Sequence, residues 1–141
     1  MLAVDYDRAC VDECERRMKA QLVAYERLVA GTGANRSSAA RAALAAFEPL
    51  FFAHLTPALD PCFVHRTRAL EGKDGNPLNE APMLWDALLR HQSTLAADKT
   101  IKYRAEASVL KLAIGDAVRL DAAQFKKLST AFLAEMRRRF V

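Results

Sequence analysis

The stretch that decides the fold is DYDRACVDECERRMKAQLVAYERLVA, residues 5–30. It contains neither proline nor glycine and is rich in Glu, Arg, Ala, Leu, Met and Lys, which are good helix formers. Its apolar side chains recur at three- and four-residue spacing, at Val11, Cys14, Met18, Leu22, Tyr25, Leu28 and Val29. Glycine, which is favoured just past a helix end, follows at positions 31 and 33. The pattern predicts one long amphipathic helix.

The apolar stripe of this helix is long and narrow. Such a stripe is buried more easily against a second copy of the chain than inside a monomer of 141 residues. We therefore expect a homo-oligomer, in the simplest case a dimer, with Val11, Met18, Leu22 and Tyr25 at the interface.

Further helices are predicted on both sides of a polar segment. One begins near Ser37 or Ser38 and runs through alanines to Phe47, where Pro49 either kinks it or starts the next helix. Residues 62–82 are rich in charged residues, Asn, Gly and Pro, which predicts a long loop with turns. Asn76 with Pro77, or Asn79 with Glu80, then caps a helix that ends near residue 91.

In the last third of the chain, the spacing of the apolar residues changes. Residues 100–120 alternate in short runs around Gly115-Asp116, which predicts two or three antiparallel strands, with a continued helix as the alternative. Asp121 and Gln124 resemble a capping box and open a C-terminal helix. The fold class we expect is mainly α: a single domain over residues 1–141, with about four or five helices and a small antiparallel β element before the C-terminal helix.

Composition excludes several classes of protein. With 52% hydrophobic residues and three cysteines, the chain is neither disordered nor a disulfide scaffold. The longest stretch without a charge, Pro49 to Leu59, is shorter than the roughly 20 residues of a membrane span, so no membrane partner is expected. The acidic N-terminus is unlike a secretory signal, and the cysteine count is odd, at Cys10, Cys14 and Cys62. Both observations predict a cytoplasmic protein.

The standard catalytic and cofactor motifs are absent from the sequence. It has no phosphate-binding glycine loop, nucleophile elbow or zinc helix, so a non-enzymatic protein without a cofactor is favoured. Cys10 and Cys14 lie one helical turn apart, but no histidine is paired at metal-ligand spacing; we expect structural thiols and no metal site. His54 lies in the apolar run LFFAHL at 50–55, which favours a core or interface role.

The polar segment is the candidate ligand site. It contains His65, Arg66, Arg68, Lys73, Asn76, Asn79 and Glu80. Two arginines two residues apart, with a lysine nearby, can grip a carboxylate or phosphate, so an anionic small molecule is the candidate ligand. The alternative, which we favour, is that these side chains satisfy the loop backbone, cap a helix or pair with one another.

The C-terminus is basic. Arg137, Arg138 and Arg139, with Lys126 and Lys127, could contact nucleic acid. Cations in the last turn of a helix also complement its dipole without any partner, and no aromatic residues interleave with the arginines, so nucleic acid is an unlikely partner.

Three segments carry a resemblance to known sequences: RTRALEGKDGNPLNE at 66–80, ADKTIKY at 97–103 and SVLKLAIGD at 108–116. They resemble a family of conserved hypothetical bacterial proteins. The resemblance implies a bacterial cytosolic protein and assigns no activity, cofactor or catalytic residue. Self-association or partner binding through helical faces is therefore the leading functional hypothesis, followed by the anion site and then nucleic-acid binding.

Overall fold

The protein is described by a computed structural model, which places residues 6–33 and 35–141. Within these residues the α-helices are α1 (Arg8–Thr32), α2 (Ser38–Leu55), α3 (Arg68–Glu71), α4 (Pro77–Arg90) and α5 (Ala122–Phe140). Three short 3-10 turns join them: η1 (Thr56–Ala58), η2 (Asp60–Phe63) and η3 (Ala105–Ala107). The mainly-α prediction is confirmed. The expected start of the first helix at Asp5 lies outside the described residues.

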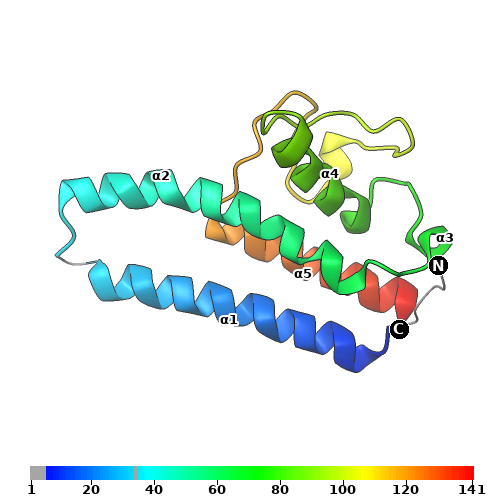
Figure 1. The fold of residues 1–141 in the computed structure, drawn as a ribbon, viewed down its shortest axis with the longest axis horizontal. Helices are drawn as coiled ribbons and strands as arrows, with labels where there is room; N and C mark the ends of the chain where they lie inside the picture. The colour runs from blue at the N-terminus through cyan, green and yellow to red at the C-terminus, as the bar shows by residue number, and fades with distance from the viewer. Residues whose placement is uncertain (1–5, 34) are drawn as a thin grey trace.

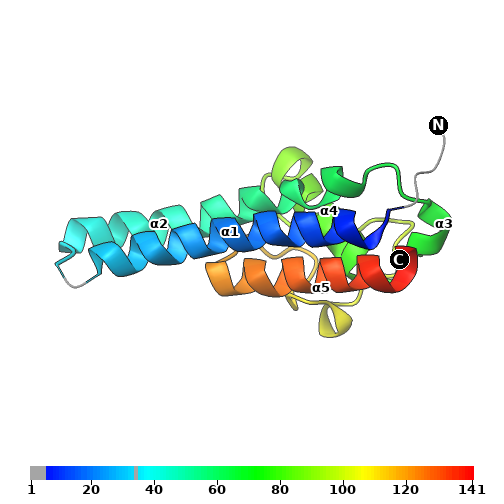
Figure 2. The same ribbon diagram turned by 90° about the horizontal axis from the view of Figure 1, so that it is seen from below.

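Two long antiparallel helices dominate the shape. α1 and α2 form a hairpin, and α5 lies along one side of it, as Figures 1 and 2 show from two directions. α4 packs against α5 and α2. The closed end of the hairpin extends well beyond the N-terminus of α5 (Figure 1). We call this projecting part, residues 26–33 and 35–47, the arm.

The apolar stripe of α1 is buried inside the single chain. Val11, Met18, Leu22 and Tyr25 are all at most 9% exposed and belong to the main core, because α1 packs chiefly on α5. α5 supplies a matching stripe that includes Phe125. The prediction that these four α1 residues form an interface between copies is therefore wrong: the chain's own helices cover them, α5 along most of α1 and Phe52 of α2 at Tyr25.

α2 continues through its proline. The helix runs unbroken from Ser38 to Leu55 with Pro49 inside it, so Pro49 does not start a new helix. Proline cannot donate a backbone hydrogen bond to the preceding turn, which weakens the helix at this point. The Pro49 carbonyl accepts a hydrogen bond from Leu120 N at 3.3 Å, and this bond ties α2 to the start of α5.

The predicted β element is not found among the described residues. Between α4 and α5 they form one isolated antiparallel bridge, Thr94 with Ala117, and the single turn η3. The buried carboxylate of Glu80 accepts hydrogen bonds from the backbone N–H groups of Val109 and Leu110 at 2.8 and 3.0 Å. A side chain thus satisfies amides that a strand would pair with a neighbour, so the alternating sequence does not form a sheet.

The predicted caps of α4 and α5 are found, the first as Asn76 with Pro77, while the alternative cap of Asn79 with Glu80 is wrong because both residues lie inside α4. The side chain of Asn76 accepts a hydrogen bond from Leu78 N, and Pro77 occupies the first turn of α4. Asp121 and Gln124 form a complete capping box at the start of α5. These caps fix where α4 and α5 begin, and so place the polar segment between α2 and α4.

Candidate functional site

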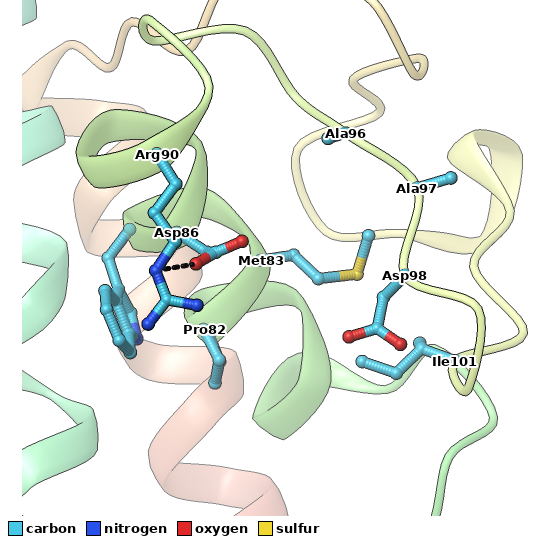
Figure 3. Close-up of a pocket in the computed structure, with 9 residues that line it drawn as sticks. Pro82, Met83, Asp86, Arg90, Ala96, Ala97, Asp98 and Ile101 are labelled. Carbon is cyan, nitrogen blue, oxygen red and sulfur yellow. Dashed lines mark ion pairs between the residues drawn. The ribbon is translucent and has the colours of Figure 1, made fainter.

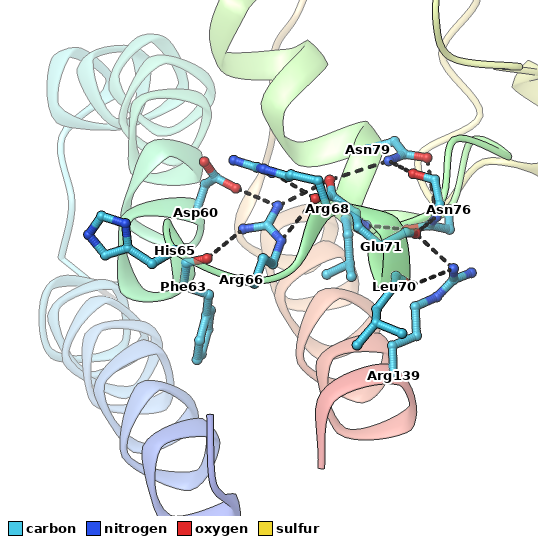
Figure 4. A network of polar contacts seen from close by, with 12 residues as sticks. Asp60, Phe63, His65, Arg66, Arg68, Leu70, Glu71, Asn76, Asn79 and Arg139 are labelled. Atoms are coloured by element: carbon cyan, nitrogen blue, oxygen red, sulfur yellow. Dashed lines mark hydrogen bonds and ion pairs between the residues drawn. The ribbon is translucent and has the colours of Figure 1, made fainter. Parts of the chain in front are cut away.

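Arg66 is the centre of a buried polar network (Figure 4). Its side chain is fully buried, and its Nη2 lies 2.8 Å from Asp60 Oδ1 of η2. Its Nε and Nη2 donate to the two carboxylate oxygens of Glu71, both at 3.2 Å, and its Nη1 donates to Phe63 O at 3.1 Å. The guanidinium also lies over the ring of Phe132, 5.8 Å from its centre. Arg66 therefore joins η2, α3 and α5 from the inside and is closed to a ligand.

The neighbouring residues of the polar segment have structural partners too. Arg68 Nη1 donates to Glu71 Oε2 at 2.7 Å. The Asn79 amide donates to Gly72 O at 3.0 Å, and its oxygen accepts from Gly75 N at 3.1 Å. Residues 62–82 are thus not one long loop: they contain the end of η2, all of α3 and the first turns of α4.

Three predicted site residues lie away from the Arg66 network. Glu80 is buried on α4 and binds the backbone of residues 109 and 110. Burial raises the pKa of its carboxyl, although these two hydrogen bonds oppose the shift. Lys73 is exposed, and the exposed His65 ring points away from Arg66 (Figure 4). The structure does not bring the seven residues together around a common space.

The network carries no surplus positive charge. Its cations are Arg66, Arg68, Arg138 and Arg139, and its paired carboxylates are Asp60, Glu71, Asp74 and Glu135. A site that attracts carboxylate or phosphate needs cations that are not already neutralised. The arrangement therefore supports the structural alternative and gives no support to an anion site.

The C-terminal arginines are held within the chain. Arg137 Nη2 lies 2.7 Å from Asp12 Oδ1 and 2.6 Å from Glu15 Oε2, which ties α5 to α1. Arg138 and Arg139 both pair with Glu135, and Arg139 Nη1 also donates to Glu71 O at 2.7 Å. These contacts give the basic tail an intramolecular role, so no observation favours nucleic acid.

A hollow of about 300 Å³ lies between α4 and residues 96–101 (Figure 3). Asp86 pairs with Arg90 at 3.3 Å and with His91 at 3.2 Å, while Asp98 accepts hydrogen bonds from Thr100. The indole N–H of Trp85 is buried and has no hydrogen-bond partner among the described residues. None of the described lining residues carries a hydroxyl or thiol, so the hollow lacks a nucleophile of the serine or cysteine kind.

All three cysteines line one surface groove. Cys10 and Cys14 of α1 and Cys62 of η2 border a space of about 400 Å³, together with Glu13 and Arg17. Cys14 is buried, Cys62 is half-buried and Cys10 is exposed. Sequence spacing indicated that Cys10 and Cys14 share a helix face, but it could not place Cys62 beside them. Within the described part of the chain, no group of three His, Cys, Asp or Glu side chains is arranged to hold a metal ion.

The outer side of α2 is an apolar surface that the described helices leave uncovered. Ala40, Ala43, Phe47, Leu50 and His54 are all exposed and recur at three- and four-residue spacing. We call these five residues the α2 seam. Phe47 and Leu50 are 49% and 54% exposed, and Phe47 stacks on Phe51 with ring centres 5.1 Å apart.

A groove continues the α2 seam toward α1. It has a volume of about 320 Å³ and lies within the arm, where Leu28 of α1 faces Ala40, Ala43 and Phe47 of α2. Leu28 is 59% exposed. The sequence identified the apolar patch at 50–55 but gave no sign that its outer side would stay uncovered.

Comparison with known proteins identifies no relative: no protein-family model, curated protein or solved structure matches the chain. The resemblance of residues 66–80, 97–103 and 108–116 to conserved bacterial proteins stays a prediction. The functional argument therefore depends on the geometry of this chain alone.

Proposed function

We propose that this protein is a non-enzymatic, self-associating helical protein of the cytosol, and that a second copy of the chain covers the α2 seam. The observation that carries the proposal is that α2 is apolar on nearly all sides and mostly uncovered. Residues 38–63 are long and apolar enough to cross a membrane by length and composition, yet only 22% of their most apolar window is buried. Helices that are hydrophobic all round are normally enclosed.

The two charged side chains of α2 lie away from the seam. Glu48 accepts a hydrogen bond from Ala122 N of α5 at 2.9 Å, so it faces the body of the protein. Arg41 donates to the carbonyl of Arg36 at 2.7 Å, at the base of the helix. None of the five seam residues is Asp, Glu, Lys or Arg. The distance along the helix from Ala40 to His54 is about 21 Å, at 1.5 Å per residue.

The sizes of the seam residues favour a second copy running antiparallel. The first half of the seam is small, with Ala40 and Ala43, and the second half is large, with Leu50, Phe51 beside it, and His54. An antiparallel copy centred on Phe47 places Ala43 opposite the partner's Phe51 and Ala40 opposite the partner's His54. At these two positions on each side of the central Phe47 pair, large side chains then meet small ones, which favours close packing.

The contact would be isologous, since both copies use the same surface. Two α1–α2 hairpins that pack face to face make a four-helix bundle, in which Leu28 and the arm groove are also covered. Three unpaired thiols fit a protein of a reducing compartment. This proposal keeps the self-association inferred from the sequence and moves its surface from α1 to α2.

The test is sedimentation velocity over a range of protein concentrations. We expect wild type to form a dimer and Phe47→Glu to stay monomeric, because the substitution places two charges at the centre of the contact. Phe47 is already half exposed, so the variant should keep the circular dichroism spectrum of wild type. Leu89→Glu is the matched control, since Leu89 is 69% exposed on α4, outside the hairpin, and this variant should dimerise like wild type.

Two outcomes would overturn the proposal. The first is a wild-type protein that remains monomeric at high micromolar concentration. The second is a protein that is monomeric in solution but floats with phospholipid vesicles, with flotation lost in Phe47→Glu; a lipid surface would then be what covers the seam.

A further inference from the structure

We propose that Cys14 and Cys62 are a redox-active pair that forms a reversible intramolecular disulfide, with a low-molecular-weight disulfide as the oxidant. The inference is independent of the proposed function, because it concerns the other end of the hairpin. Its basis is the meeting of two thiols from distant parts of the sequence at one groove, which is open to small molecules.

Cys14 and Cys62 are neighbours in this groove, where Cys62 Sγ donates a hydrogen bond to Ala58 O at 3.4 Å. Burial and the neighbouring Cys62 together raise the pKa of Cys14 to about 12. Cys62 comes from η2, whose turn is fixed by the Arg66 network through Asp60 and Phe63. The pair is therefore held together by the body of the fold.

Cys10 is the wrong partner for Cys14. Its side chain is hydrogen-bonded to Asp7, which is the main reason that the pKa of Cys10 is raised. Cys10 and Cys14 are also one turn apart on an intact helix, where Cβ atoms are about 5–6 Å apart. A disulfide requires Cβ atoms about 3.5–4.5 Å apart, so α1 itself prevents a bond between Cys10 and Cys14.

Exposure sets the order of the reaction. Cys62 is half-buried and lines the groove, whereas Cys14 is buried and kept protonated. The Cys62 thiolate attacks one sulfur of the small disulfide, forms a mixed disulfide and releases one small thiol. Cys14 then loses its proton to solvent and attacks the Cys62 sulfur, which releases the second small thiol.

The overall change is balanced. Two protein S–H bonds and the S–S bond of the oxidant are broken, while one protein S–S bond and two small-molecule S–H bonds form. Two electrons pass from the protein thiols to the oxidant. Cytosolic disulfides of this kind are typically transient, and a reduced thiol pool reverses the bond.

The test equilibrates the full chain in glutathione buffers of increasing oxidised fraction, quenches it with acid and counts alkylated thiols by intact mass. We expect wild type to pass from three alkylated thiols to one, with peptide mapping locating the bond between Cys14 and Cys62. Oxidation should also raise the melting temperature by roughly 5–15 °C, because the bond restricts the unfolded chain.

Two variants make the assignment specific. Cys10→Ser is the matched control and should form the disulfide at the same buffer ratio as wild type. Cys62→Ser should form no intramolecular bond, and its melting temperature should not rise in the oxidising buffer. The proposal fails if wild type stops at a glutathione adduct, if the bond joins two chains on a non-reducing gel, or if Cys10→Ser abolishes it.

Discussion

Replacing Arg66 with alanine removes a fully buried cation and leaves the carboxylates of Asp60 and Glu71 behind. Breaking a buried ion pair from one side typically costs about 3–5 kcal/mol, since the remaining charge is desolvated without compensation. Glu71 keeps Arg68 at 2.7 Å, which puts the expected loss in the free energy of unfolding near the lower limit, about 3 kcal/mol. This loss is a large share of the total free energy of unfolding of a typical domain, which is roughly 5–15 kcal/mol.

Urea unfolding followed by circular dichroism at neutral pH measures this loss. Arg68→Ala is the control within the same network: its side chain is 56% exposed, so its loss should stay below about 1 kcal/mol. A third variant, Arg66→Met with Asp60→Asn and Glu71→Gln, should recover part of the stability, because it removes the stranded charges together with the cation. Equal, small losses in Arg66→Ala and Arg68→Ala would refute the structural role of Arg66. Phosphate stabilisation beyond that of sodium chloride at matched ionic strength, lost in Arg68→Ala, would instead support an anion site.

Two glycine substitutions test the backbone, one beside this network and one in the arm. Gly75→Ala should lower the free energy of unfolding by roughly 1–3 kcal/mol in urea titrations, because φ is +84° and a Cβ would lie 2.8 Å from the Lys102 carbonyl oxygen. Gly31→Ala has open space within α1 and should instead raise it by about 0.5–1 kcal/mol; a loss there comparable to that of Gly75→Ala would contradict the argument. Glu80 has a raised pKa, so the folded state holds its proton more tightly than the unfolded chain, and the stability it contributes falls as pH rises above about 4.5. The unfolding free energy of wild type minus that of Glu80→Gln should therefore decrease between pH 5 and pH 7, and a constant difference would show that Glu80 does not titrate in this range.

Local chemistry explains why the helices were predictable. The stripe from Val11 to Tyr25, the Asn76 cap and the Asp121 capping box all act within a few residues, so each can be read from the sequence itself. The predicted strands failed because the partner of their amides is distant: Glu80 lies about 30 residues away from Val109 and Leu110. Alternation of apolar and polar residues indicates only that a segment has two different faces. It does not indicate which groups accept hydrogen bonds from the backbone amides of that segment.

The candidate site shows the same limit. The sequence shows that polar residues gather at 65–80. It does not show that Asp60 and Glu71 enclose Arg66, so that this cation is neutralised and cannot bind an anion. It also assigned the α1 stripe to a second copy, because nothing local distinguishes a stripe covered by α5 from one covered by a partner. The sequence also did not predict that one side of α2 is uncovered, because alanine occurs both in cores and on surfaces.

The projecting arm gives the molecule two regions of unequal local stability. Of the described residues between 26 and 47, Val29, Arg36 and Leu44 are half-buried and the others are exposed. Local unfolding of the arm therefore breaks few packing contacts. Its amide hydrogens should exchange with solvent long before those of α5, and protease cleavage should begin within the arm. Pro49, where α2 lacks a backbone hydrogen bond, marks the boundary at which such fraying would stop. The body can thus stay folded while the arm melts and re-forms.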